Sequence, residues 1–163
     1  MIVYHGSTEI IKNPDVIHSK KYLDFGQGFY ITTFGNQAKR WAARKKMRQG
    51  KQAIVNVYEL SEKWDSFKVL SFENENEKWL DFACACRKGK SLNQNYDIII
   101  GNVADDDVFK TVDMYFRGLW DKDKVLSELR YYKMNNQICI VNQETLNQVI
   151  TFKNAYEVKD NDR

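Results

Sequence analysis

Short runs of β-branched and aromatic residues alternate with segments whose apolar residues recur three and four positions apart. The first pattern is typical of strands and the second of helices. The expected strands span residues 1–4, 29–33, 53–60, 67–72, 96–101, 137–141 and 150–158. The expected helices span residues 37–49, 75–88, about 108–119, about 122–132 and 143–149. Several strands follow one another without an intervening helix, which favours an α+β fold with a split mixed or antiparallel sheet over a doubly wound parallel sheet.

A glycine turn precedes the second strand. Gly26 and Gly28 are separated by one residue, and glycine lets the backbone turn tightly and approach a ligand closely. Tyr30 lies on the strand that follows. Asn36 is expected to cap the next helix, and Gly50 to end it. The turn and its strand are therefore candidates for ligand contact.

Length and composition predict one globular domain. The chain has 163 residues, of which 43% are apolar and 29% charged. We expect a single domain over residues 1–158 and a flexible tail over residues 159–163. No window approaches the roughly 18 apolar residues of a membrane span, and the N-terminus does not resemble a signal peptide. These features predict a cytoplasmic protein with no membrane partner.

The sequence contains few residues that could bind a metal ion. The three cysteines form no paired zinc motif, and His5 and His18 are the only histidines. Walker, GxSxG and His-Glu-x-x-His motifs are absent from the sequence. We expect free cysteine thiols and no bound metal.

Positive charge is concentrated in one segment although the net charge is only +3. The expected helix and its end, residues 37–51, carry Lys39, Arg40, Arg44, Lys45, Lys46, Arg48 and Lys51. Such a basic segment either is a solvated helix surface or binds phosphate groups. Nucleic-acid binding through this helix therefore stays open as an alternative function.

His5 follows the first expected strand and is followed by Gly6 and Ser7. At the end of a strand, a histidine next to glycine and a small hydroxyl residue can meet a ligand with side chain and backbone together. The alternative is a histidine whose role is only structural.

Three segments together resemble the three motif regions of the ADP-ribosyltransferase superfamily, in its diphtheria-toxin and poly(ADP-ribose) polymerase branch. They are Tyr4-His5-Gly6-Ser7, the stretch 26–33, and the late strand 136–141. Over nearly its full length the chain is also similar to a bacterial family of uncharacterised proteins assigned to that superfamily. That likeness lies in the core Leu-Asp-Phe-Gly-x-Gly-Phe-Tyr and in residues 37–42 and 99–106.

The resemblance implies a split sheet that holds NAD as a co-substrate. His5 would bond a ribose hydroxyl, and the Gly6 backbone would meet the nicotinamide carboxamide. Tyr30 would stack on the nicotinamide ring, which suits an amphipathic aromatic side chain. Further contacts with NAD are expected from Ser7, Gly28 and Thr32.

Gln137 departs from the pattern of this branch. It stands where the resemblance implies a glutamate that bonds the ribose and stabilises positive charge as nicotinamide leaves. A neutral amide can orient a ribose but supplies no negative charge. His5, Tyr30 and Gln137 are therefore the expected catalytic residues, with Gln137 the weakest match.

The leading hypothesis is an NAD-dependent mono-ADP-ribosyltransferase or NAD hydrolase. The resemblance further implies a bacterial toxin that modifies a protein or nucleic acid and is paired with a small antitoxin. A catalytically silent module that binds NAD or ADP-ribose is the alternative favoured by Gln137.

Overall fold

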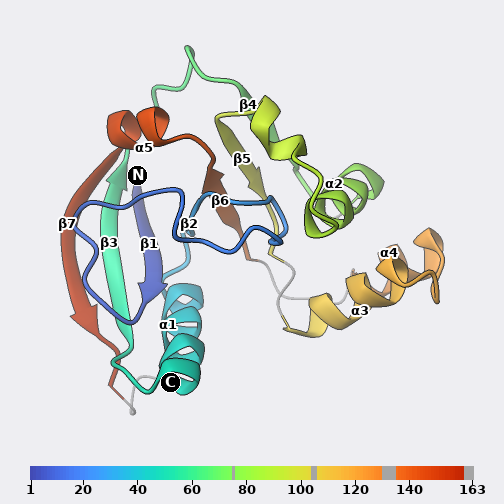
Figure 1. The fold of residues 1–163 in the computed structure, drawn as a ribbon, viewed down its shortest axis with the longest axis horizontal. Coiled ribbons are helices and arrows are strands. Elements are labelled where there is room, and N and C mark those ends of the chain that lie inside the picture. The colour runs from blue at the N-terminus through green and yellow to red at the C-terminus, as the bar shows by residue number, and fades with distance from the viewer. Residues whose placement is uncertain (75, 104–105, 130–134, 160–163) are drawn as a thin grey trace.

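The computed structural model describes residues 1–74, 76–103, 106–129 and 135–159 (Figure 1). Within these residues the chain forms seven strands in two sheets, five α-helices and one short 3-10 helix. The fold is α+β, as the sequence predicts. Residues 160–163 of the expected tail lie outside the described residues.

The first sheet is antiparallel and has the order β1-β3-β7. Its strands are β1 (Ile2–Ser7), β3 (Ile54–Leu60) and β7 (Ile150–Glu157). β1 therefore extends through the segment 5–7, beyond its expected end at residue 4. Its pairing with β3 reaches from Ile2 opposite Glu59 to Ser7 opposite Ile54.

The second sheet is mixed and has the order β2-β6-β5-β4. Its strands are β2 (Phe29–Ile31), β6 (Gln137–Ile140), β5 (Ile98–Gly101) and β4 (Val69–Ser71). Only β4 and β5 run parallel. β6 and β7 follow each other in the chain but belong to different sheets.

One bridge connects the two sheets among the described residues. The Tyr4 N–H donates to the Thr32 carbonyl at 2.8 Å, and the Thr32 N–H donates to the Tyr4 carbonyl at 2.9 Å. β1 and β2 meet at this pair, and β1 continues beyond it without a strand partner on that side within the described part of the chain.

Helices lie beside both sheets. α1 runs beside β1, and α2, α3 and α4 lie on the far side of the second sheet (Figure 1). The helices are α1 (Gly35–Gln49), α2 (Glu77–Arg87), α3 (Asp106–Phe116), α4 (Lys122–Leu129) and α5 (Gln143–Val149), with the 3-10 helix η1 at Leu92–Asn95.

Strand alternation separates the apolar residues into three clusters. Ala38 and Ala42 of α1 pack on the outer face of the first sheet. Between the sheets, Ile138 and Ile140 of β6 join residues from β1, β2 and β3. Cys139, between them in sequence, faces the opposite side, in the cluster that α2 covers. Alternate side chains of one strand point to opposite faces, so the two sides of the second sheet hold different residues.

Two expected helix caps are wrong. α1 begins at Gly35, two residues before the expected start, and its N-cap is Phe34 rather than Asn36. α2 is capped by Asn76, whose side chain accepts from the Trp79 N–H at 3.0 Å, rather than by Asn74.

Other helix ends agree with the prediction from the sequence. Asn142 caps α5, and Gly50 adopts the left-handed conformation after α1. Residue 105, just before α3, lies outside the described residues, as do residues 130–132 at the expected end of α4. The basic helix expected over residues 37–51 is α1, over residues 35–49.

Gly6 lets β1 approach α1 closely. A Cβ atom there would clash with the Ala38 carbonyl oxygen and lie 2.6 Å from the Ala42 nitrogen. We therefore expect Gly6→Ala to lower the free energy of unfolding by about 1–3 kcal/mol, since helix backbone cannot move aside as a side chain can. Urea denaturation measures this change.

Gly35→Ala is the matched control for this substitution. The nearest atoms to its Cβ would be those of the Tyr4 ring, at 3.6 Å and beyond, which is ordinary contact. Alanine in the first turn of a helix should leave stability unchanged or raise it by up to about 1 kcal/mol. Equal losses in both variants would contradict close packing as the reason for Gly6.

Candidate functional site

Hydrogen bonding and stacking fix the His5 ring just after the bridge at Tyr4, where β1 and β2 diverge. Its Nδ1 lies 2.6 Å from the Tyr30 carbonyl oxygen, and the ring stacks on Phe29 with centroids 4.7 Å apart. A carbonyl can only accept, so Nδ1 carries the proton in the neutral ring. Nε2 is then an acceptor, and it bonds none of the described residues. The site thus offers one oriented acceptor for a hydroxyl.

His5 is neutral at physiological pH. Burial, and then the charge of Lys45, lower the pKa of His5 to about 3, against the opposing effect of the bond to Tyr30. The ring therefore keeps its acceptor nitrogen over the whole range in which most enzymes work.

The Gly6 backbone lies on the free edge of β1. Tyr4 directs its N–H and carbonyl toward Thr32, and groups two residues along a strand point the same way. Gly6 therefore directs both groups away from β3. Its carbonyl accepts from the Lys45 ammonium at 2.7 Å, while its N–H has no partner among the described residues. Burial lowers the pKa of Lys45.

Tyr30 closes the glycine turn with its hydroxyl. Oη donates to the Gly26 carbonyl at 2.5 Å and accepts from the Phe25 N–H at 3.1 Å. Burial raises the pKa of Tyr30 well above its ordinary value. Gly26 has φ +73°, which favours glycine. The turn expected from the sequence is present, and Tyr30 is bonded to it.

Gln137 lies in a buried polar network and is 4% exposed. Its Nε2 donates to Asp24 Oδ2 at 3.0 Å and to the Asn102 carbonyl at 3.1 Å. Asp24, 7% exposed, forms an ion pair with Arg87. Arg87 Nε donates to Asp24 Oδ1 at 2.7 Å, and Nη2 donates to the same oxygen. This network links the glycine turn, α2 and β6.

Asp24 is a site residue that sequence reasoning missed. A carboxylate between the apolar residues Leu23 and Phe25, next to a glycine turn, indicates a buried charge that needs a partner. Charged groups are rarely buried unless they are paired. Arg87 gives no comparable signal, because an arginine in the last turn of a helix is ordinary.

Thr32 belongs to a second polar cluster. Its hydroxyl donates to Asn136 Oδ1 at 2.8 Å, and Asn136 Nδ2 donates to the Thr33 hydroxyl at 2.7 Å. Gln37 of α1 donates from Nε2 to the Asn136 carbonyl, also at 2.7 Å. Thr32 is fully buried. Its hydroxyl thus ties the end of β2 to β6, and the cluster holds α1 beside both.

The remaining predicted contacts are packed closely. Gly28 adjoins β6, where an added Cβ would lie 2.5 Å from the Cys139 sulfur. Ser7 is buried, and its side chain bonds none of the described residues.

The structure brings some of the predicted residues together and separates others. Tyr30 and Gln137 lie on the same face of the second sheet and both border the turn at 24–26. His5 is joined to Tyr30 through the Tyr30 main chain, and its ring lies against Phe29, which faces the other side. His5 and the amide of Gln137 thus flank β2 from opposite faces.

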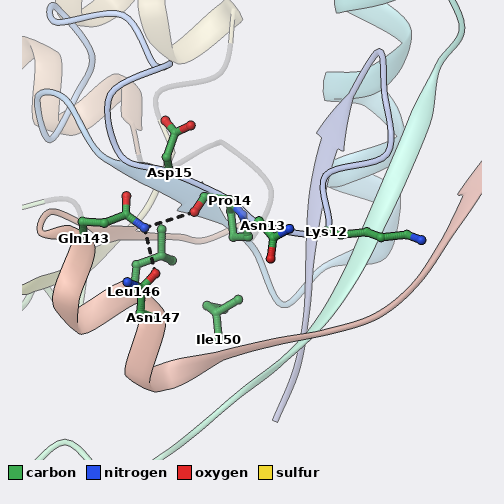
Figure 2. A pocket seen from close by; sticks show the side chains of 8 residues that line it. All are labelled: Lys12, Asn13, Pro14, Asp15, Gln143, Leu146, Asn147 and Ile150. Carbon is green, nitrogen blue, oxygen red and sulfur yellow. Dashed lines mark hydrogen bonds between the residues drawn. The ribbon is translucent and has the colours of Figure 1, made fainter.

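A shallow pocket lies elsewhere, between the segment 12–15 and α5 (Figure 2). It has a volume of about 330 Å³. Gln143 lines the pocket and donates from Nε2 to the Pro14 carbonyl at 3.2 Å and to Asn147 Oδ1 at 2.9 Å. None of the residues expected to contact NAD lines this pocket.

Metal ligands and membrane-spanning helices can both be judged from residues 1–74, 76–103, 106–129 and 135–159. No three His, Cys, Asp or Glu side chains of these ranges gather in a group that could hold a metal ion. None of the helices there has the length and apolar composition needed to cross a bilayer.

In the described part of the chain, fold and site define an α+β protein with two sheets that meet at one bridge beside a neutral histidine. The chain belongs to the family described as protein of unknown function (DUF3990), whose model matches residues 1–152. No curated protein and no solved structure matches the chain.

Proposed function

We propose that this protein is an NAD-dependent mono-ADP-ribosyltransferase, acting on a protein or nucleic-acid acceptor as a bacterial toxin with a small antitoxin partner. The observation that carries the proposal is the oriented acceptor Nε2 of His5, next to the free N–H of Gly6, at the point where β1 leaves β2. These residues are also the first segment that resembles the superfamily.

The roles of the two residues follow from their donors and acceptors. His5 Nε2 accepts a hydrogen bond from a ribose hydroxyl, and the Gly6 N–H donates to the carboxamide oxygen of nicotinamide. The reaction breaks the bond between ribose C1′ and the nicotinamide nitrogen, and nicotinamide leaves with the electron pair. An acceptor nucleophile then bonds C1′ and loses its proton.

The charge of α1 suits an acceptor molecule that is a polyanion. α1 contains six Lys and Arg residues and no acidic residue, and it packs beside β1, which carries His5. Arg40 and Arg48 are exposed. Such a helix attracts phosphates at long range, which supports a nucleic-acid acceptor. Salt would then weaken acceptor binding.

A silent NAD-binding module is the second candidate, favoured by one observation. Gln137 is neutral, and its Nε2 is already bonded to Asp24 and Asn102. Without a carboxylate at this position, positive charge at C1′ has weaker stabilisation. The two functions separate experimentally, because the module binds NAD without releasing nicotinamide.

We expect NAD to raise the thermal midpoint of the protein and His5→Ala to weaken NAD binding by roughly 3- to 10-fold. The expected loss is that of one neutral hydrogen bond, about 0.5–1.5 kcal/mol. Calorimetric titration with NAD measures affinity, and chromatography of the mixture measures released nicotinamide.

His18→Ala is the matched control for His5→Ala. The His18 side chain is 83% exposed and lies in the segment before the glycine turn, paired with Asp15. This variant should bind NAD like the wild type. Absence of any NAD binding by the wild type would overturn the proposed function, and NAD binding without nicotinamide release would favour the silent module.

A further inference from the structure

Lys45 lies on the face of α1 that packs against the first sheet. Ala38 and Ala42 occupy that face, and Lys45 follows Ala42 by three positions, so it lies on the same side of the helix. Its ammonium reaches the free edge of β1 and donates to the Gly6 carbonyl at 2.7 Å. Only part of the residue remains exposed. A lysine thus stands where the pattern of an amphipathic helix calls for an apolar residue.

The charge of Lys45 has no counter-ion in the described part of the chain. Its hydrogen-bond partner there is the neutral Gly6 carbonyl, and α1 contains no acidic residue. Burial lowers the pKa of Lys45, and no carboxylate of the described residues opposes this effect. Burying an ammonium is costly unless an anion compensates its charge. An anionic ligand would provide that compensation.

Phosphate is the anion that suits this position. The charge of Lys45 also lowers the pKa of His5, which places the ammonium within electrostatic range of the ring. His5 Nε2 offers an acceptor to a ribose hydroxyl. A nucleotide carries hydroxyls and a phosphate on the same ribose, so a ribose at His5 brings phosphate oxygens toward Lys45. The ammonium has three N–H donors, of which the Gly6 carbonyl takes one, and lysine is a common phosphate ligand.

We infer that Lys45 binds the diphosphate group of a nucleotide at the edge of β1. In naming NAD as that nucleotide the inference rests on the proposed function, whereas the anion site itself does not require that NAD be cleaved. In the complex the ammonium keeps its bond to the Gly6 carbonyl and donates its other protons to phosphate oxygens. The Gly6 carbonyl positions the ammonium, and the diphosphate compensates its charge.

Titration with ADP-ribose tests the inference without a chemical step, because ADP-ribose retains the diphosphate of NAD and lacks the nicotinamide. We expect Lys45→Met to weaken ADP-ribose binding on the order of 10-fold or more, as for one hydrogen bond between charged groups. Lys45→Arg keeps the charge and should recover most of this loss. Inorganic pyrophosphate should compete with ADP-ribose for the wild type, and adenosine, which has no phosphate, should not distinguish Lys45→Met from the wild type. Calorimetry measures each affinity.

Lys51→Met is the matched control, since it removes the same charge from the exposed end of the same basic segment. At physiological ionic strength its affinity for ADP-ribose should match the wild type, because charges at the surface are screened. Equal losses in Lys45→Met and Lys51→Met would show a long-range effect of charge only and overturn the inference. An unchanged affinity in Lys45→Met, or no binding of ADP-ribose by the wild type, would overturn it too.

Two further outcomes separate this inference from other functions of the same helix. If Lys45→Met loses affinity for an oligonucleotide but not for ADP-ribose, the residue contacts the acceptor and the inference is wrong. If ADP-ribose binds through Lys45 but the protein releases no nicotinamide from NAD, the proposed transferase is wrong and the diphosphate site stands.

A titration of the wild type keeps the inference testable if Lys45→Met does not fold. In protein labelled with ¹³C at lysine, the Lys45 Cε signal is identified by its absence from Lys45→Arg. A bound diphosphate stabilises the charged ammonium, so ADP-ribose should raise the pKa of Lys45 by about one, which corresponds to tenfold tighter binding to the charged form. A pKa that saturating ADP-ribose leaves unmoved would place the diphosphate elsewhere and overturn the inference.

Discussion

Arg87→Met should lower the free energy of unfolding by roughly 3–5 kcal/mol, the cost typical of breaking a buried ion pair by removing one partner. The side chains of Arg87 and Asp24 are 12% and 8% exposed, so solvent screens this pair little. Methionine fills much of the same volume, so the loss reports charge rather than a cavity. Urea denaturation at pH 7 measures it.

Arg87→Lys separates charge from geometry. Lysine keeps the positive charge but cannot place two N–H groups of a rigid plane on Asp24. It should recover part of the stability lost in Arg87→Met. A loss below about 1 kcal/mol in Arg87→Met would show that the pair contributes no more than an exposed one.

Gln137→Glu should destabilise the protein by roughly 2–4 kcal/mol at pH 8, because it buries a second carboxylate against Asp24 and the Asn102 carbonyl. The resemblance implies a glutamate at this position for its charge in catalysis, which says nothing of the stability of the fold. The network predicts that this carboxylate lowers stability, because it would lie beside Asp24.

The pH dependence gives this variant a distinct signature. Burial and the charge of Asp24 raise the pKa of a carboxyl group at position 137, so the folded state holds a proton that the unfolded state loses near pH 4.3. The unfolded state then binds fewer protons, and stability falls as pH rises above that value. The difference from wild type should thus be smallest near pH 4 and grow toward pH 8.

Gln137→Met provides the comparison for this pH profile. It removes the same two hydrogen bonds without adding a charge, so its difference from wild type should change little between pH 5 and pH 8. Parallel pH profiles for Gln137→Glu and Gln137→Met would contradict the placement of residue 137 against Asp24.

The secondary structure followed from local patterns because its causes are local. Asn142 caps α5 through a bond three residues ahead, and the apolar run of β5 has no polar residue to expose. β1 is longer than expected because β3 pairs with it as far as Ser7. Distant pairing partners of this kind leave no mark in a short window of sequence.

The site was foreseeable only in part. The sequence singled out His5, Tyr30 and Gln137 by their types and neighbours. Their partners come from far along the chain: Asp24 lies 113 residues from Gln137 and 63 residues from Arg87. Periodicity cannot reveal a contact over such distances, and so the network could not be predicted.

The placement of β6 and β7 has a consequence for biosynthesis. The ribosome makes the segment 135–157 after every strand that β6 and β7 join. β6 lies between β2 and β5, so the second sheet stays in two pieces until that segment emerges, and the first lacks its third strand. A nascent chain that ends before residue 137 also lacks the amide that Asp24 holds. Neither sheet can therefore be completed, and the contact between Asp24 and Gln137 cannot form, until β6 and β7 have been synthesised.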